Sequence, residues 1–176
     1  LRDPNTRSVP RPKIIQMKLD LEEKEQRPTN SIDGFLEHMQ TLMPTLYEHR
    51  CSEDEPGGFF SRVKDGTWMG HVIEHIALEL QTLAGMDCGF GRTRCTGSEG
   101  EYFVVSDHMV EDAGVYAAQA AVRVAQAWID AKEYNLEEDI QRLREIREDT
   151  RLGPSTGSVV EEAVKQGIPF IRLIQQ

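Results

Sequence analysis

The sequence predicts an α+β fold in which a small, mainly antiparallel sheet packs on helices. Three observations support this class. Apolar residues alternate over residues 13–21, a glycine-rich stretch over residues 85–107 contains two short strand patterns, and long helical patterns lie between and after them. The resulting order of strand, helix, helix, strand, strand and helix places the helices on one face of the sheet. Further helices follow toward the C-terminus.

Length and charge restrict the function classes. The 176 residues are enough for one compact domain with a single core. The chain carries 20 basic and 30 acidic residues, a net charge of −10, which argues against nucleic acid or an anionic membrane as the main partner. A basic or zwitterionic partner fits better. No apolar run reaches the roughly 20 residues that a membrane-spanning helix needs.

The cysteines indicate the compartment. Cys51, Cys88 and Cys95 are an odd number without CxxC spacing, and the chain shows no signal peptide, so we expect no disulfide framework and a cytoplasmic location. The chain begins at Leu1 without a methionine and stops soon after the strand-like residues 168–174. We therefore expect a fragment of a longer protein.

The first strand is expected at residues 13–21, where four apolar residues from Ile15 to Leu21 share one face. A polar connection follows. Asn30 or Ser31 can cap a helix over residues 35–43.

Pro44 is expected to kink or end that helix, and residues 59–66 predict a short helical turn. The longest helical pattern of this half lies between Gly66 and Gly85. One broad face of it is apolar. The other side carries His71, His75, Glu79 and Thr82.

The second half begins with a hairpin. Strands are expected at residues 92–96 and 101–106, joined by a turn at residues 97–100. An alanine-rich helix over residues 110–131 and a charged helix over residues 136–149 follow. The tail predicts a Ser/Thr-rich loop, a short helix and a strand. We place the domain at residues 1–150 and a connecting segment at residues 151–176.

The strongest chemical signal is the HxxEH sequence at residues 71–75. His71 and His75 stand one helical turn apart on one face, so they can share a zinc ion, and Glu74 beside them can act on its bound water. This is the inverted zincin signature. In inverted zincins the motif helix packs on an antiparallel sheet, and the predicted element order is compatible with this. The alternative is a solvated helix face that happens to carry these residues.

A catalytic zinc normally has three protein ligands, and the third remains open here. Glu111, at the start of the alanine-rich helix, is the first candidate because inverted zincins draw a glutamate ligand from a later helix. Glu79, Asp112 and His49 are the alternatives. Glu79 lies two turns from His71, roughly 12 Å along the helix axis, which makes a shared metal awkward.

Two further residues are candidates for catalysis. Arg92 follows a flexible Gly-Phe-Gly and can bind a substrate carboxylate or polarise a carbonyl, although a surface ion pair is the commoner fate of an arginine. Cys51, close to His49 and Arg50, can be considered as a nucleophile. A buried, inert cysteine is the more common case.

The chain resembles the amino-terminal domain of cyanophycin synthetases. The resemblance covers nearly the whole chain, and its most specific part is GTWMGHVIEHIALELQ combined with GFGRTR. The matching stretches are RPKIIQMKLDLEE, EQRPTNSIDGF, LYEHRCSE, PGGFFSRVKDGTWMGHVIEHIALELQTLAGM, GFGRTR, EDAGVYAAQAAVRV and REIREDTRLGPSTGSVVEEAVKQGIPFIRL.

The resemblance implies a parent ligase that polymerises aspartate and arginine. An ATP-grasp domain, beginning near residues 151–176, would extend the aspartate backbone, and a Mur-ligase-like domain would add arginine to its side chains, both with ATP and Mg²⁺. We expect the full-length parent to be a homo-oligomer. This chain alone is expected to make no polymer.

For this chain the resemblance implies a domain that holds the cyanophycin polymer. In some members its HxxEH helix also forms a metallopeptidase-like site that cuts the polymer into primers. Carried over, His71 and His75 would bind zinc, Glu74 would be the general base and Arg92 would contact the substrate. The alternative is a non-catalytic docking domain, and a third ligand within reach of the histidines favours the hydrolase.

Overall fold

The computed structural model describes residues 13–51, 54–150 and 153–169. Its sheet has three antiparallel strands, β1 (Ile14–Asp20), β2 (Gly91–Cys95) and β3 (Glu101–Asp107). The strand order is β1-β3-β2, so β3 is central and β2 is an edge strand. The expected α+β class, the first strand and the hairpin are confirmed.

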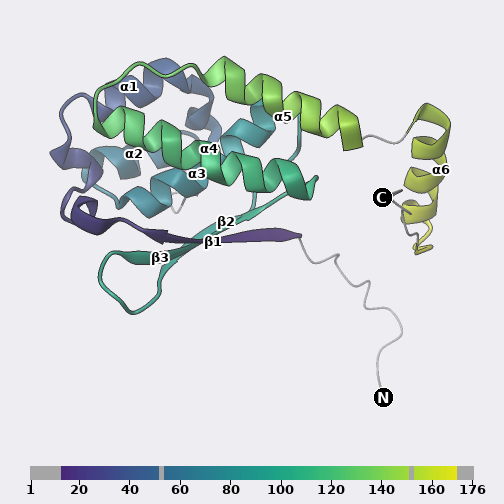
Figure 1. Cartoon of the computed structure of the whole chain (residues 1–176), viewed down its shortest axis with the longest axis horizontal. Helices are drawn as coiled ribbons and strands as arrows, with labels where there is room; N and C mark the ends of the chain where they lie inside the picture. Colours follow the sequence, from purple (N-terminus) through teal and green to yellow (C-terminus); the bar gives the residue numbers. More distant parts are fainter. Residues whose placement is uncertain (1–12, 52–53, 151–152, 170–176) are drawn as a thin grey trace.

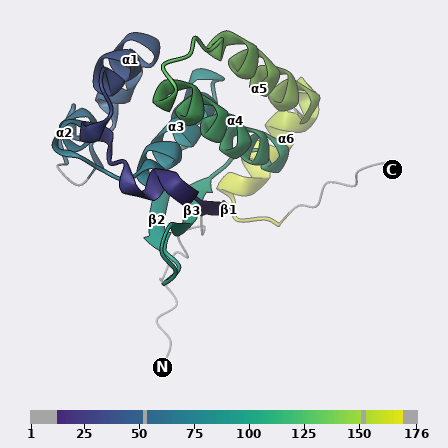
Figure 2. The same ribbon diagram turned by 60° about the vertical axis from the view of Figure 1, so that its left-hand side comes forward.

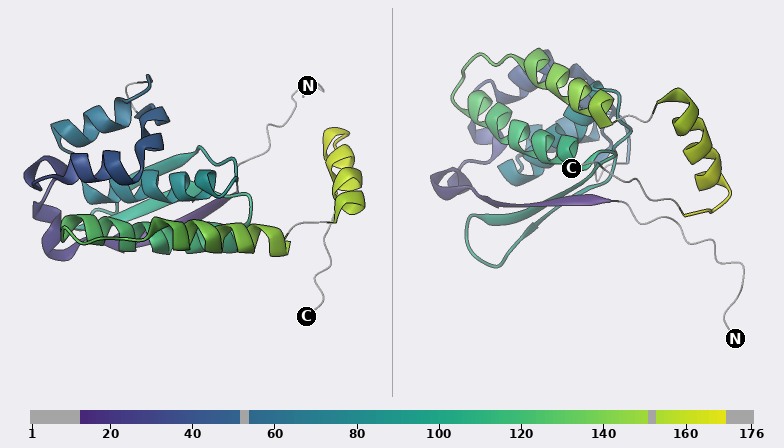
Figure 3. Two further views of the ribbon diagram at one scale, coloured as in Figure 1. Left: turned by 90° about the horizontal axis from the view of Figure 1, so that it is seen from above. Right: turned by 45° about the vertical axis from the view of Figure 1, so that its right-hand side comes forward.

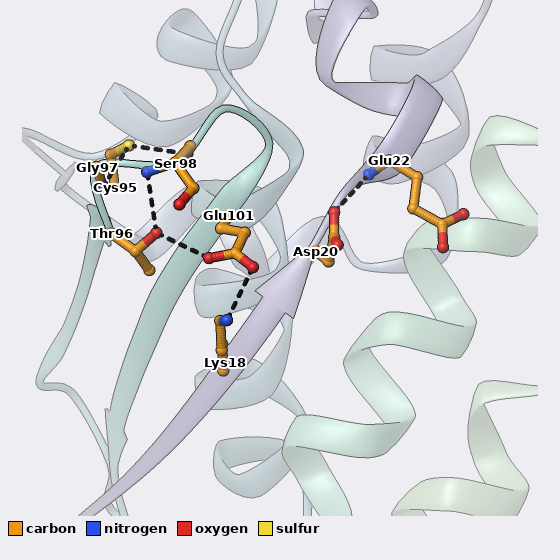
Figure 4. Close-up of polar contacts among 8 residues, drawn as sticks. All are labelled: Lys18, Asp20, Glu22, Cys95, Thr96, Gly97, Ser98 and Glu101. Carbon is orange, nitrogen blue, oxygen red and sulfur yellow. Dashed lines mark hydrogen bonds and ion pairs between the residues drawn. The ribbon is translucent and has the colours of Figure 1, made fainter.

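Polar contacts hold the β2–β3 turn (Figure 4). The backbone N–H of Thr96 donates to the Glu101 carbonyl at 3.0 Å, and its hydroxyl donates to the Glu101 carboxylate at 3.2 Å. The same carboxylate accepts a 2.8 Å bond from Lys18 on β1. Gly97 and Gly100 have φ of 102° and 76°, values that glycine adopts without a steric cost. Glu101 therefore ties the turn to the opposite edge strand.

The helices account for most of the chain. Short 3₁₀ segments, η1 (Glu22–Gln26), η2 (Thr29–Ser31) and η3 (Pro44–Glu48), separate the first ones. The α-helices are α1 (Phe35–Leu42), α2 (Gly58–Asp65), α3 (Met69–Leu83), α4 (Glu111–Ile129), α5 (Leu136–Thr150) and α6 (Pro154–Lys165). None of the helices in the described ranges is long and apolar enough to cross a bilayer.

The helices lie on one face of the sheet (Figures 1 and 2). Helix α3 packs against β2 and β3, and α4 packs beside it against α3 and β1. Small buried side chains on α4, among them Ala113, Ala117 and Ala120, allow the two helices to approach closely. The core therefore lies between the sheet and the α3–α4 pair.

Helix α5 is joined to α4 by a buried carboxylate. Asp139 accepts hydrogen bonds from the hydroxyls of Tyr116 and Tyr134, at 2.7 and 2.6 Å. It also forms an ion pair with Arg123, at 2.8 Å. Burial alone would raise the pKa of Asp139, but these hydrogen bonds outweigh it, so the pKa lies below its usual value. The expected charged helix thus has a specific anchor.

The expected capping of α1 is wrong. Its N-cap is Gly34, with φ of 70°. The Asn30 amide instead donates to the Asp65 carbonyl at 2.9 Å, and the Ser31 hydroxyl donates to the Pro28 carbonyl at 2.7 Å. Asn30 thus ties the segment before the helix to the end of α2, and Ser31 closes a turn within that segment. Helix α1 does end before Pro44, as predicted.

The tail differs from the prediction in one respect. The Ser/Thr residues expected in a loop lie inside α6, which begins at Pro154. Most of the expected last strand, residues 170–174, lies outside the described residues. Helix α6 stands apart from the layers (Figure 3). The domain boundary at residue 150 stays a prediction.

Candidate metal centre

A cleft of about 890 Å³ lies between α3, the edge strand β2 and the segment that follows η3. It contains His71, Glu74 and His75 of the HxxEH sequence, together with Arg92. The HxxEH sequence is not on a solvated helix face, because Glu74, His75 and the nearby Glu79 are buried and His71 is partly buried. The alternative interpretation of the motif as a solvated surface is therefore wrong.

Three donor atoms converge in the cleft, from Cys51, His71 and His75, which we call the donor cluster. These atoms all lie within 4.8 Å of one another. His71 Nε2 is 3.1 Å from His75 Nε2 and 3.3 Å from Cys51 Sγ. A tetrahedral zinc with ordinary bond lengths places two nitrogens about 3.3 Å apart and a nitrogen and a sulfur about 3.6 Å apart. The donor types and the two spacings from His71 fit zinc.

The side chain of His71 is oriented by Thr67, four residues earlier in the sequence. Its Nδ1 lies 3.0 Å from the Thr67 hydroxyl, which can donate or accept and so satisfies either tautomer. Thr67 is itself fixed, because its N–H donates to the Thr29 hydroxyl at 2.9 Å. Burial, with a smaller contribution from the charge of Arg62, lowers the pKa of His71 to about 4. The imidazole is therefore neutral at pH 7, as a metal ligand must be.

His75 is oriented by a hydrogen-bond relay of two further side chains. His49 Nε2 lies 2.8 Å from Glu79 Oε2, and His49 Nδ1 lies 2.8 Å from His75 Nδ1. A carboxylate accepts only, so a neutral His49 donates through Nε2 and accepts at Nδ1. His75 then donates through Nδ1, which leaves the lone pair of its Nε2 facing His71. Ligating histidines in metal sites are commonly oriented in this way.

The same surroundings also determine the charges of Glu79 and His75. Burial would raise the pKa of Glu79, but the hydrogen bonds from His49 and the Thr45 hydroxyl outweigh it and the pKa lies below the usual value. Burial lowers the pKa of His75, and the neighbouring His71 and His49 lower it further. Glu79 is thus ionised and His75 neutral at pH 7. Phe59 covers the other side of His75.

Glu74 occupies the side of the cleft next to β2. Its Oε2 accepts a 2.6 Å hydrogen bond from the Thr93 hydroxyl. Burial raises the pKa of Glu74, and the Thr93 bond and the charge of Arg92 oppose the shift only in part. A carboxylate with a raised pKa beside a metal site is suited to general base and acid chemistry.

The structure does not bring the first candidate for a third ligand to the histidines. Glu111 and Asp112 are exposed in the first turn of α4 and do not line the cleft. Glu79 and His49 do line it, but they bind each other and orient His75. Cys51 supplies the third donor.

Sequence reasoning considered Cys51 only as a nucleophile. The available signal was its place in LYEHRCSE, two residues after His49. Cys51 has φ of 51°, an uncommon conformation for a residue with a Cβ, and this turn brings its side chain to His71.

Comparisons with known proteins identify the family of this chain. The family described as "Cyanophycin synthase-like N-terminal domain" matches residues 16–130, which include most of β1, all of β2 and β3, and helices α1 to α4. The chain belongs to this family. The matched range includes the HxxEH helix, the edge strand and the donor cluster of this chain.

Curated relatives support the same assignment. The chain is 48% identical to a cyanophycin synthetase of Geminocystis herdmanii and 50% identical to one of Trichormus variabilis. A cyanophycin synthetase of Crocosphaera subtropica is 46% identical. Each match covers 98% of this chain and 20% of the relative. The chain therefore spans about a fifth of the length of these relatives.

Proposed function

We propose that this chain is the N-terminal domain of an ATP-dependent cyanophycin synthetase, and that its cleft is a zinc-dependent, peptidase-like site that cuts the polymer into primers. The polymerising chemistry, with ATP and Mg²⁺, would belong to the ATP-grasp and Mur-ligase-like domains of the parent. The names of the relatives, which are all cyanophycin synthetases, support the first part. The geometry of the cleft supports the second.

The third donor atom, from Cys51, is the observation that most strongly supports a hydrolase. Two histidines alone make a weak zinc site, whereas His71, His75 and Cys51 provide the three protein ligands typical of a catalytic zinc. Nitrogen and thiolate ligands suit zinc better than the hard cations Mg²⁺ and Ca²⁺. A zinc ion held there would supply a Lewis acid for the carbonyl of the scissile amide and for an attacking water.

The protein's own residues then have separate roles. Glu74 takes the proton of the attacking water and returns it to the leaving amine, a task that its raised pKa favours. Thr93 holds the Glu74 carboxylate in place. Arg92, which lines the cleft beside Glu74, contacts a carboxylate or carbonyl of the substrate.

The charge of the cleft fits a polymer that carries arginine. Its exposed acidic residues are Glu48 and Asp87, in a chain of net charge −10, and Arg50 and Arg92 also line it. Carboxylates attract guanidinium groups, and exposed pairs of this kind weaken as salt rises. We therefore expect cyanophycin oligomers to bind with an affinity that falls with ionic strength. Binding that does not depend on salt would contradict this contribution.

The test uses zinc content and chain length together. Glu74→Gln keeps the size of the side chain but removes the base, so chain shortening should fall by about 100-fold or more while zinc content and folding are retained. His71→Ala should lose zinc as well. The wild type should contain about one zinc per chain and shorten cyanophycin.

Two results would contradict the proposed hydrolase mechanism. If Glu74→Gln cleaves at the wild-type rate, Glu74 is not the base. If the wild type binds oligomers but neither holds zinc nor shortens the chains, the non-catalytic docking function is correct, which the acidic cleft by itself would support.

A further inference from the structure

The edge strand β2 runs along the cleft that contains the donor cluster. The strand order β1-β3-β2 gives β2 a partner on one side only, within the described residues. Gly91, Arg92 and Thr93 of this strand line the cleft. The second edge of β2 therefore faces the space in which a substrate would lie.

The hydrogen-bond register shows which residues present their backbone to that space. Asp107 N–H donates to the Phe90 carbonyl at 2.8 Å, and Thr96 N–H donates to the Glu101 carbonyl at 3.0 Å. Hydrogen-bonded pairs alternate along an antiparallel ladder, so Arg92 and Arg94 also bond to β3. The N–H and C=O groups of Gly91 and Thr93 must then point to the open edge.

These two residues are also the ones next to the general base. The Thr93 hydroxyl bonds to Glu74, and a Cβ built on Gly91 would lie 2.7 Å from Glu74 Oε1. Alternate residues of a strand are about 6.6–6.8 Å apart, which is also the repeat of alternate residues in an extended peptide. A peptide paired with Gly91 and Thr93 would carry its scissile amide past Glu74.

We propose that the aspartate backbone of the polymer binds as a fourth strand on β2, through the N–H and C=O groups of Gly91 and Thr93. The proposal rests on the proposed function, because it takes the cyanophycin polymer as the substrate. Main-chain pairing of this kind gives affinity, and pockets for alternate side chains give selectivity.

The charges around the strand fit this occupant. Arginine joined through its amine to an aspartate side chain keeps a guanidinium and a carboxylate. Side chains of a bound strand alternate between the two faces of the sheet. On one face they meet the acidic cleft with Glu48 and Asp87. Arg92 also lines this cleft and can pair with the carboxylates of the polymer, as can Arg94 two residues further along β2.

The test measures amide hydrogen exchange at single residues. The zinc-loaded Glu74→Gln chain is mixed with a synthetic oligomer of aspartate with arginine on each side chain, which this variant should bind without cutting. Exchange at Gly91 and Thr93 should slow by about tenfold or more. Exchange at Arg92 and Arg94, already bonded to β3, should change little.

A matched probe separates backbone pairing from charge. An oligomer with every backbone amide N-methylated keeps all side chains and charges but cannot donate to the strand. It should bind about tenfold or more weakly.

The outcomes distinguish this proposal from the proposed function. If the oligomer binds and the wild type shortens it, but exchange at Gly91 and Thr93 is unchanged, the fourth strand is wrong and the hydrolase stands. Equal binding of the methylated oligomer would also overturn the fourth strand. If no oligomer binds and none is shortened, both proposals fail.

Discussion

The phenyl ring of Phe59 stacks on the imidazole of His75, with ring centroids 3.9 Å apart and planes inclined by 22°. Phe59, on α2, is fully buried and also meets His71 edge-on, with a centroid distance of 5.7 Å. One apolar side chain thus limits the rotation of both histidines. The candidate metal centre and the hydrophobic core share this residue.

We expect Phe59→Ala to lower the free energy of unfolding by about 3–5 kcal/mol, because it removes a large buried side chain. Urea denaturation at equilibrium measures this. Phe103→Ala is the matched control, since Phe103 is 37% exposed on the uncovered face of the sheet. Its cost should be below about 1 kcal/mol. A cost for Phe59→Ala no larger than that for Phe103→Ala would contradict this contribution of Phe59 to stability.

Glu79→Gln should weaken zinc binding by about 10–100-fold, because a neutral amide holds the N–H of His49 more weakly than the carboxylate does, and His49 then fixes His75 less firmly. Competition with a chromophoric chelator measures the affinity. Glu48→Gln removes a carboxylate from the exposed rim of the same cleft and should leave the affinity close to that of the wild type. If both variants lose affinity equally, the net charge of the cleft matters and the relay does not.

Gly91→Ala should lower cleavage of cyanophycin by about 100-fold, because a Cβ there displaces the Glu74 carboxylate. Zinc content should not change. Gly89→Ala is the control, since a Cβ at Gly89 meets nothing within 4 Å. Wild-type cleavage by Gly91→Ala would show that the position of Glu74 is not critical.

Asp139→Asn should destabilise the fold by about 1–3 kcal/mol at pH 7, because it removes the charge that Arg123 and two tyrosines bind. The pKa of Asp139 is depressed in the folded chain, so its stabilisation is complete above the ordinary aspartate pKa of about 3.9 and is lost as pH falls through the folded pKa. The difference from the wild type should therefore narrow below about pH 4.

Asp130→Asn serves as the control for this pH series. Asp130 pairs with the exposed Lys132, and exposed ion pairs contribute about 0–1 kcal/mol. Denaturation curves for the three proteins from pH 3 to pH 7 compare the two sites. A constant difference between Asp139→Asn and the wild type over this range would contradict a charge effect.

Local sequence patterns predicted those strands and turns whose local preference agrees with their place in the fold. The alternation from Ile15 to Leu21 marks β1 because one face of the sheet is covered and the other is open. Glycines 97 and 100 mark the hairpin because its turn needs positive φ. The capping of α1 could not be predicted, because Asn30 bonds to Asp65, which is 35 residues away in the sequence.

The residues of the candidate site also fall into those that a local pattern predicts and those that it does not. His71, Glu74 and His75 follow from helical spacing alone. His49 and Cys51 reach them from a segment 20 or more residues earlier, and the left-handed conformation of Cys51 is one that no periodicity indicates. Glu111 was a reasonable ligand by element order, but α4 packs over β1, whereas the cleft lies on the β2 side of α3.

Helix α3 is buried at twelve of its fifteen positions, by the sheet below, α4 beside it and the η3–α2 region around the cleft. Amide protons at such positions exchange with solvent only through the largest opening events of a domain. Residues His71 to Gln81 should therefore report the global unfolding equilibrium. The groups proposed for chemistry would therefore sit on the most slowly opening unit of the molecule.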